Sequence, residues 1–496
     1  MQMKKMFSTN IVVMLFAIYI KGVEPSQVVG CYYGSWAGYR TGNGCFQPEN
    51  INASLCTHMF YSFVGITSNG GIRILDEWND LPSGKDFFGR FNMLKTTHPN
   101  VKTLVAVGGW NEGSVTFSMV ANDASLRAAF AKNAANFVLQ YGFDGFDIDW
   151  EYPASRGGAA SDYEAYALML KELRSVFDHH GLLLTAAVHS GPSYIDTSYN
   201  VKEISQYLDL INIMTYDYHG SWDSTAGHNA PLYKSSADIT AADLVLNVDA
   251  SIQHWLQNGA VAEKLVLGVG TYGHSFTLSD SSNTAIGAAV SGPGIAGPYT
   301  QESGSLGYNE VCLNINAGWN VVWDDNILAP YAYSGNQWVG FDNAESAKIK
   351  AEYARDLGLA GVFIWSLETD DFTGSCGDGK FPILTALNAV VRTSDGNNEA
   401  TTPSVGSTDS TATATTTIGS DSSDTSPQSS STTSPPTQLC SSVGYVRDPN
   451  DCQIFYYCQS NGLNGFTNHK FQCFGDLVYD VTLNLCNYKD QVPECN

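Results

Sequence analysis

The chain has 496 residues, of which 49 are acidic and 25 are basic, so that its formal net charge is −24 at pH 7. A surface of this charge repels phosphate backbones, which disfavours nucleic acid as a partner and favours an uncharged polymer. Aromatic side chains make up 12% of the chain, and their rings can stack on sugar rings as well as build a core.

Residues 1–23 have the pattern of a secretory signal peptide. Lys4 and Lys5 precede the apolar run Ile11 to Ile20, which is shorter than the roughly 20 residues needed to span a bilayer. A membrane anchor or a buried first strand is the alternative. No later stretch is apolar for long enough to cross a membrane, so we expect a secreted, extracellular protein with no membrane partner.

Short apolar runs alternate with helix-length segments through residues 24–393. Near-continuous apolar runs are typical of parallel strands that are buried on both faces. Helical patterns follow at 125–142 and 161–181, the second with a glycine cap at Gly181. Eight such repeats predict an α/β fold, a (β/α)8 TIM barrel. A doubly wound open sheet is the alternative, but no glycine-rich nucleotide-binding motif follows the first strand. The predicted strands are Val28 to Gly34, Thr57 to Gly65, Val101 to Gly109, Gly145 to Trp150, Leu182 to Ser190, Leu208 to Tyr216, Lys264 to Tyr272 and Ala360 to Glu368.

Three further regions are predicted around this barrel. The gap between the seventh and eighth strands predicts a small α+β insertion subdomain at about 273–339, which would form one wall of a cleft. Residues 394–438 are rich in Ser and Thr and almost lack large apolar side chains, so they predict a disordered linker that is O-glycosylated. Residues 439–496 hold six of the eleven cysteines and predict a small disulfide-rich β domain.

Three acidic residues lie in the fourth predicted strand, in the run DGFDIDWE. Because side chains alternate faces along a strand, Asp147, Asp149 and Glu151 share one face, and the apolar residues between them share the other. Three carboxyl groups about 6.6 Å apart cannot all ionise cheaply, so one pKa should be raised enough for a general acid. A metal cluster or a solvated acidic edge is the alternative; metal sites usually add His ligands, which this run lacks.

DGFDIDWE fits the DxxDxDxE signature of glycoside hydrolase family 18, and CYYGSWAGYR, GGWN, MTYDYHGSWD, GYNEVC, QWVGFDNAES and VFIWSLETDDFTG resemble segments of animal chitinases. The resemblance implies an endo-acting, retaining chitinase in which the substrate's own N-acetyl group is the nucleophile. It makes Glu151 the general acid and later the base. Asp149 would orient the acetamido N–H, Asp147 would share a proton with Asp149, and Tyr216 would bind the acetamido oxygen. The implied substrate-binding residues are Tyr32, Trp36, Trp110, Asn111, Met214, Asp217, Trp222, Tyr272, Glu302 and Trp365.

The family resemblance also implies the pairs Cys31–Cys56 and Cys312–Cys376, which leaves Cys45 as a free thiol or an intermolecular link. Where many relatives carry Arg, this chain has His274, which could make substrate binding pH-dependent. Asn52 begins a possible N-glycosylation site, Asn52-Ala53-Ser54.

The spacing of the last six cysteines allows fifteen connectivities and does not choose among them. With Phe455, Tyr456, Tyr457 and Tyr479, the module resembles the peritrophin-A type chitin-binding domain, although a generic disulfide-rich module is the alternative. The resemblance implies the pairs Cys440–Cys458, Cys452–Cys495 and Cys473–Cys486.

The expected partners are therefore chitin and chito-oligosaccharides, with no cofactor or metal, and we expect a monomer. Two other functions use the same barrel. A chitinase-like lectin would bind oligosaccharide without cleaving it, but such proteins usually lack the acid at the position of Glu151. A relative that cleaves N-glycans is disfavoured by the chitin-binding tail and the insertion. Endo- or exo-action, processivity and physiological role do not follow from the residues.

Overall fold

The computed structural model describes residues 28–392, 444–460, 466–473, 477–481, 485–489 and 492–495. The predicted signal peptide and linker lie outside these ranges. The chain divides into two units, one holding 28–392 and the other the described residues from 444 onward, and each is described by itself. No helix within these ranges is long and apolar enough to cross a membrane.

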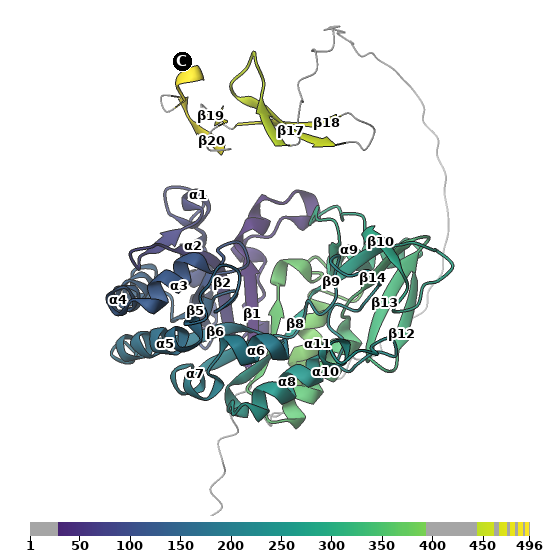
Figure 1. Ribbon diagram of the computed structural model, residues 1–496, viewed down its shortest axis with the longest axis horizontal. Coiled ribbons are helices and arrows are strands. Elements are labelled where there is room, and N and C mark those ends of the chain that lie inside the picture. The colour runs from purple at the N-terminus through teal and green to yellow at the C-terminus, as the bar shows by residue number, and fades with distance from the viewer. Residues whose placement is uncertain are drawn as a thin grey trace, which may run out of the picture. The chain divides into compact units, whose positions relative to one another are not determined.

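Eight parallel strands form a closed barrel in the first unit (Figure 1). Closure comes from β1, which pairs in parallel with both β2 and β15. The predicted (β/α)8 barrel is confirmed, and the open sheet is excluded. The barrel strands are β1 Val28–Gly34, β2 His58–Ile66, β4 Lys102–Gly108, β5 Gly145–Asp149, β6 Leu183–His189, β7 Leu210–Met214, β8 Leu265–Gly270 and β15 Gly361–Trp365, and β3 Ile72–Ile74 runs antiparallel to β2.

Helices cover the outside of the barrel, as Figure 1 shows for α4 and α5. Both helical patterns found in the sequence are present at these places. Asp123 caps α4, because its carboxylate accepts hydrogen bonds from the main-chain N–H groups of Ser125 and Leu126. The helices of the barrel are α1 Glu77–Asp80, α2 Phe87–Thr97, α3 Val115–Asn122, α4 Ala124–Tyr141, α5 Asp162–Asp178, α6 Pro192–Ser198, α7 Val201–Tyr207, α8 Val248–Gln257, α10 Ala344–Asp356 and α11 Pro382–Val391.

The end of α5 confirms the predicted glycine cap. The N–H of Leu182 donates to the carbonyl of Phe177 at 3.2 Å, and the N–H of Gly181 donates to that of Asp178 at 3.5 Å. This pair of bonds is the Schellman arrangement, which needs a left-handed residue between them. Gly181 supplies it with a φ of 64°.

The insertion between β8 and β15 forms a sheet of its own, which lies to one side of the barrel in Figure 1. The seventh strand was predicted to run to Tyr272, but β8 ends at Gly270. Thr271 turns the chain there, because its N–H donates to Trp365 O and its hydroxyl to Ser366 O. Tyr272 therefore begins the insertion. Its elements are β9 Tyr272–Leu278, β10 Val290–Pro293, β11 Ser305–Gly307, α9 Tyr308–Asn316, β12 Asn320–Asp324, β13 Ala329–Ser334 and β14 Gln337–Gly340.

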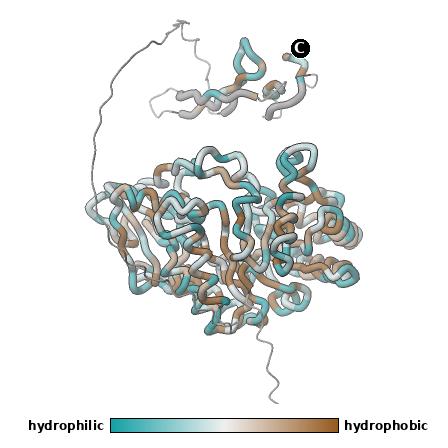
Figure 2. The backbone as a smooth tube through the Cα atoms, turned by 180° about the vertical axis from the view of Figure 1, so that it is seen from behind, coloured by the Kyte–Doolittle hydropathy of each residue, from teal (hydrophilic) through white to brown (hydrophobic). Residues whose placement is uncertain are grey.

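The barrel has two apolar layers, and hydrophobic segments are concentrated along its strands (Figure 2). Inside the barrel, Tyr32, Phe60 and Phe363 pack together, with the rings of Tyr32 and Phe60 stacked at 4.3 Å. Between strands and helices lies the larger layer, which includes Phe146 and Ile148 of β5. The inner layer fills the barrel, so that the site lies above it at the carboxyl ends of the strands.

The second unit is built from short antiparallel strands. One sheet has the order β16-β17-β18, and β19 pairs with β20. Their bounds are β16 Gly444–Arg447, β17 Ile454–Ser460, β18 Phe466–Gln472, β19 Leu477–Asp480 and β20 Leu485–Tyr488. The predicted small β domain is confirmed.

Candidate active site

The acidic residues of β5 face the inside of the barrel, as their alternation predicted. Asp147 and Asp149 are buried, and Glu151 lies two residues beyond Asp149 with 9% of its surface exposed. The intervening Ile148 and Trp150 belong to the outer apolar layer instead. A solvated acidic edge is therefore excluded.

Asp147 is held below the cleft by two hydroxyl groups. Tyr32 donates to one carboxylate oxygen at 2.9 Å, and Thr185 donates to the other at 2.5 Å. Burial raises the pKa of Asp147 to about 6. The predicted sharing of a proton between Asp147 and Asp149 stays a prediction, because both oxygens of Asp147 bond elsewhere.

Asp149 is the carboxyl group with spare hydrogen-bonding capacity. Its Oδ1 is buried without a hydrogen-bond partner among the described residues. Burial raises the pKa of Asp149 well above its usual range, and the nearby charges of Glu151 and Asp147 raise it further. An unpaired buried acceptor is costly, so Asp149 is ready to receive a donor from a bound ligand.

Glu151 lies at the mouth of the barrel beside a cation that the sequence reasoning missed. Burial raises the pKa of Glu151 to about 7, and the charge of Asp217 adds to this effect while Arg156 opposes it. The guanidinium of Arg156 donates to the main-chain carbonyl of Glu151 at 2.9 Å and lies 3.4 Å from the ring centroid of Trp110. Glu151 is thus a carboxyl group that can remain protonated near neutral pH.

The segment after β7 brings Tyr216 and Asp217 to the same cleft. Tyr216 is buried, whereas half of the Asp217 side chain is exposed. Two groups of the insertion bind Asp217 Oδ1: the hydroxyl of Tyr272, and His274 Nε2 at 2.7 Å. Tyr272 thus contacts Asp217 but is not among the residues that line the cleft, and its expected role in substrate binding stays a prediction.

Asp217 and His274 form an ion pair whose members shift each other. Loss of water opposes ionisation of Asp217, but the hydrogen bond and charge of His274 outweigh it, so the pKa of Asp217 falls below its usual value. Burial disfavours the charged form of His274, but Asp217 raises the pKa of this imidazole above 6.5 overall. Because half of Asp217 faces the open cleft, water weakens this pair relative to a buried one.

The cleft above these groups has a volume of about 1230 Å³ and is lined by aromatic and polar side chains. Trp110 and Trp222 expose 58% and 62% of their surfaces. Trp365 packs against Tyr32 and Trp36, with ring centroids 5.6 and 6.2 Å apart. Every residue expected to bind substrate lines the cleft except Tyr272. Those that do are Tyr32, Trp36, Trp110, Asn111, Met214, Asp217, Trp222, Glu302 and Trp365.

The cleft residues that the sequence analysis missed include Tyr152, Arg156, His189 and Tyr194. The rings of His189 and Tyr194 stack at 4.0 Å, and Tyr152 lies 4.4 Å from His189. Burial lowers the pKa of His189 to about 4, so its ring is neutral near pH 7. The close spacing of Tyr152 and Arg156 after Glu151 could have revealed two of them, and His189 stands at the carboxyl end of β6.

The cysteine pairs implied for the barrel are present: Cys31 bonds to Cys56, and Cys312 bonds to Cys376. Cys45 is a free thiol whose sulfur lies 3.8 Å from the carbonyl of Gly38. Among the described residues, one group has the spacing of metal ligands, formed by Asp371 with Cys312 and Cys376. The disulfide occupies both sulfurs, so they are not thiolate ligands.

In the second unit, Cys452 bonds to Cys495 as the resemblance implied. Cys458 and Cys473 are also disulfide-bonded. Their implied partners, Cys440 and the side chain of Cys486, lie outside the described residues, as does the side chain of Tyr457. Two of the expected aromatics, Phe455 and Tyr479, stack at 4.1 Å, and the hydroxyl of Tyr456 donates to Asp448 at 2.9 Å.

A TIM barrel with buried carboxyl groups at the carboxyl ends of its strands and tryptophans along the cleft has the features of a glycoside hydrolase. Residues 28–370 match Glycosyl hydrolases family 18, and the chain belongs to this family. Residues 440–495 match the Chitin binding Peritrophin-A domain. The family resemblance stated for both parts is confirmed.

Relatives and solved structures are similar to the barrel. Mouse (Mus musculus) chitotriosidase-1 is 41% identical over 368 residues, covering 72% of this chain and 76% of the relative. The structure of Ostrinia furnacalis Group IV chitinase in complex with allosamidin is 45% identical, with a TM-score of 0.72 over 74% of this chain and 98% of that chain. Human YKL-39, described as a pseudo-chitinase with retained chitooligosaccharide binding, is 36% identical, with a TM-score of 0.68 over 74% and 99% of the two chains.

Proposed function

We propose that this protein is a secreted, endo-acting chitinase that hydrolyses the β-1,4 linkages between N-acetylglucosamine units. The observation that carries the proposal is the pairing of two carboxyl groups at the cleft. Glu151 has a pKa raised to about 7, and Asp149 has a buried oxygen without a partner among the described residues. The first can give a proton near neutral pH, and the second can receive an N–H.

In the proposed first step, the proton of Glu151 passes to the glycosidic oxygen while the bond from that oxygen to the anomeric carbon breaks. The carbonyl oxygen of the substrate's own acetamido group attacks the same carbon and forms an oxazolinium ion. Asp149 accepts the acetamido N–H through its Oδ1, which is unpaired among the described residues. The hydroxyl of Tyr216 donates to the acetamido oxygen.

In the second step, a water molecule attacks the anomeric carbon and loses its proton to Glu151, which restores the acid. The oxazolinium ring opens back to the acetamido group. Because each of the two steps inverts the anomeric carbon, its configuration is retained overall. Asp147 supports this site from below through its bonds to Tyr32 and Thr185. Every electron pair and proton is supplied by the chain, the substrate and water.

The cleft and the second unit support chitin as the substrate. Exposed indoles such as Trp110 and Trp222 can stack on pyranose rings, while the neutral polymer avoids the repulsion that the chain's −24 charge imposes on anions. The chitin-binding module, tethered through the linker, would raise the local concentration of the barrel on an insoluble polymer. We also propose that the protein is secreted and monomeric, that the linker is O-glycosylated and that Asn52 is N-glycosylated.

A chitinase-like lectin is the second candidate, since the pseudo-chitinase YKL-39 shares the fold. Hydrolysis of soluble chitin oligomers by the wild type beside Glu151→Gln decides between them. Turnover that collapses in the variant while oligomer binding persists is the expected result. Glu112→Gln is the matched control, because it changes a cleft carboxylate already held by Arg73 at 2.9 Å and should keep turnover. Binding without cleavage by the wild type at every pH would establish the lectin.

A further inference from the structure

Asp217, the residue paired with His274, has an unusual backbone. Its φ is 60°, in the left-handed region that residues other than glycine adopt at a cost. Such conformations persist where surrounding contacts determine them. The contacts that do so here come from Asn229, twelve residues later in the segment that follows β7.

Asn229 is buried and uses both ends of its amide group. Its Oδ1 accepts the N–H of Asp217 at 3.0 Å, and its Nδ2 donates to the carbonyl of Tyr272 at 3.0 Å. The Asn229 carbonyl accepts the N–H of Tyr218, also at 3.0 Å. Since the Tyr272 hydroxyl donates back to Asp217 Oδ1, the three side chains close a ring that fixes both the main chain and the carboxylate of Asp217.

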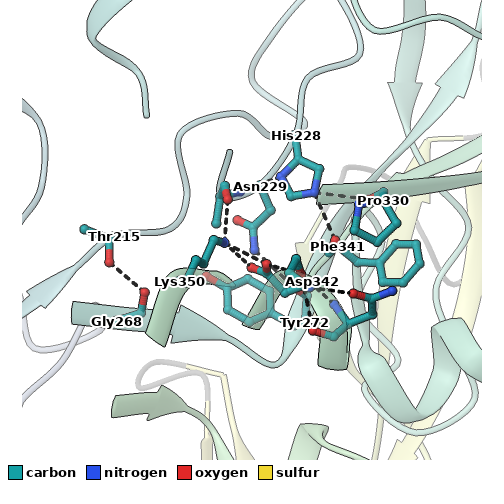
Figure 3. A network of polar contacts seen from close by, with 12 residues as sticks. Thr215, His228, Asn229, Gly268, Tyr272, Pro330, Phe341, Asp342 and Lys350 are labelled. Carbon is teal, nitrogen blue, oxygen red and sulfur yellow. Dashed lines mark hydrogen bonds and ion pairs between the residues drawn. The ribbon is translucent and has the colours of Figure 1, made fainter. Parts of the chain in front are cut away.

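A buried ion pair holds Asn229 in turn (Figure 3). Lys350 of α10 and Asp342 have no exposed side-chain surface, and the Lys350 ammonium lies 2.6 and 2.7 Å from the two Asp342 oxygens. The same ammonium donates to the carbonyl of Ala230 at 2.6 Å. On the other flank, His228 Nδ1 accepts the N–H of Ala230 and Nε2 donates to Phe341 O. The main chain on both sides of Asn229 is therefore anchored to the insertion and to α10.

We propose that Asn229 is a positioning residue that holds the Asp217 carboxylate against His274 and Tyr272 and within reach of Glu151. The anchored segment 228–230 gives the amide one orientation, and the amide gives Asp217 its left-handed backbone. The position of Asp217 can be measured whether or not the protein turns over chitin. Its kinetic consequence rests on the proposed chitinase function, because the charge of Asp217 is one of the groups that raise the pKa of Glu151.

The positional claim is tested by NMR titration of histidine labelled at Cε1 in the full chain, with the His274 signal assigned by its loss in His274→Gln. In Asn229→Ala, Asp217 should move away from His274, so the pKa of His274 should fall from its raised wild-type value. Asn388→Ala is the matched control, since Asn388 is a buried asparagine of α11 that donates to Leu55 O at 2.7 Å. An unchanged His274 pKa in Asn229→Ala would overturn the proposal. Asn229→Ser, which keeps a polar group in the buried site, replaces the alanine variant if that variant does not fold.

The kinetic consequence is measured on chitin oligomers. In Asn229→Ala, the alkaline limb of kcat/KM should move to lower pH, because Glu151 loses part of the charge that raises its pKa. Asn388→Ala should leave the limb in place even if it lowers stability. A limb that stays in place in both variants would overturn the link to Glu151. A wild type without turnover would instead refute the proposed function, while the titration would still decide the position of Asp217.

Discussion

Replacing Glu151 by glutamine should abolish turnover and, at alkaline pH, make the protein more stable. The pKa of this carboxyl group is 4.5 in an unfolded chain and about 7 in the folded protein, with burial as the main cause. The folded state therefore binds the proton more tightly than the unfolded state. This contribution to stability is fully present below the unfolded pKa and is lost as pH rises through the folded pKa.

The size of the effect follows from the same two values. At about 1.4 kcal/mol for each pKa unit, the wild type should lose about 3 kcal/mol between about pH 4 and pH 8 from this group alone. Glutamine has the same shape and no charge to lose. The difference in unfolding free energy between Glu151→Gln and wild type should therefore grow by about 3 kcal/mol in favour of the variant over that range.

Urea unfolding of the full chain at both pH values measures this difference. Glu263→Gln is the control, because Glu263 is exposed and its replacement removes the same formal charge from the surface. We expect a pH-dependent gain for Glu151→Gln and none of that size for Glu263→Gln. A gain for Glu151→Gln that is equal at pH 4 and pH 8 would refute a buried carboxyl group with a raised pKa.

Three other outcomes are expected. The alkaline limb of kcat/KM for chitin oligomers should lie near pH 7, where Glu151 loses its proton, and should move lower in Asp217→Asn; a profile that stays flat well above pH 7 would contradict this role. The KM for chitin oligomers should rise at alkaline pH in the wild type, as the imidazolium of His274 loses its charge, but should not rise in His274→Arg. Identical pH profiles of KM for the two proteins would exclude a role of His274 in pH-dependent substrate binding. Lys350→Met should cost about 3–5 kcal/mol in urea unfolding, because it leaves the buried Asp342 carboxylate without its cation. The double variant with Asp342→Leu should recover most of that loss, and an equal loss in the single and double variants would contradict the ion-pair argument.

The barrel and its acids could be predicted from local patterns: near-continuous apolar runs between helical segments indicate the barrel, and a period of two indicates the shared face of the acids. A period of two places Asp147 and Asp149 on one face and Ile148 on the other, whatever the rest of the chain does. Strand ends were less well placed: the run 208–216 was predicted as a strand, and β7 is Leu210–Met214. Ends depend on where tertiary contacts stop the pairing, which no single segment encodes.

The remaining groups of the site depend on contacts between segments of the chain. Arg156 joins it by folding back over Trp110, and Asn229 joins it through a buried anchor on α10. His189 lies in the run 182–190, which predicted a strand but matched no functional motif. The presence of Asn229 and His189 depends on packing between segments, and one sequence carries no pattern for such contacts, whereas the short spacing between Glu151 and Arg156 could have indicated Arg156. His274 was noticed only because it departs from the resemblance.

Two carboxyl groups of the cleft, Glu151 and Asp217, have pKa values that their surroundings shift in opposite directions. Burial favours the acid form of Glu151, and the opposing cation, Arg156, donates a hydrogen bond to the main-chain carbonyl of Glu151. Asp217 meets an imidazolium and a tyrosine hydroxyl directly, so its ionised form is favoured. Pairs of groups whose pKa values are separated in this way mark the acid and its charged neighbour. A bound uncharged sugar would displace water from both, which raises the pKa of Glu151 further while His274 keeps Asp217 ionised. Bound substrate would therefore make Glu151 hold its proton more tightly until the glycosidic oxygen is in place to receive that proton.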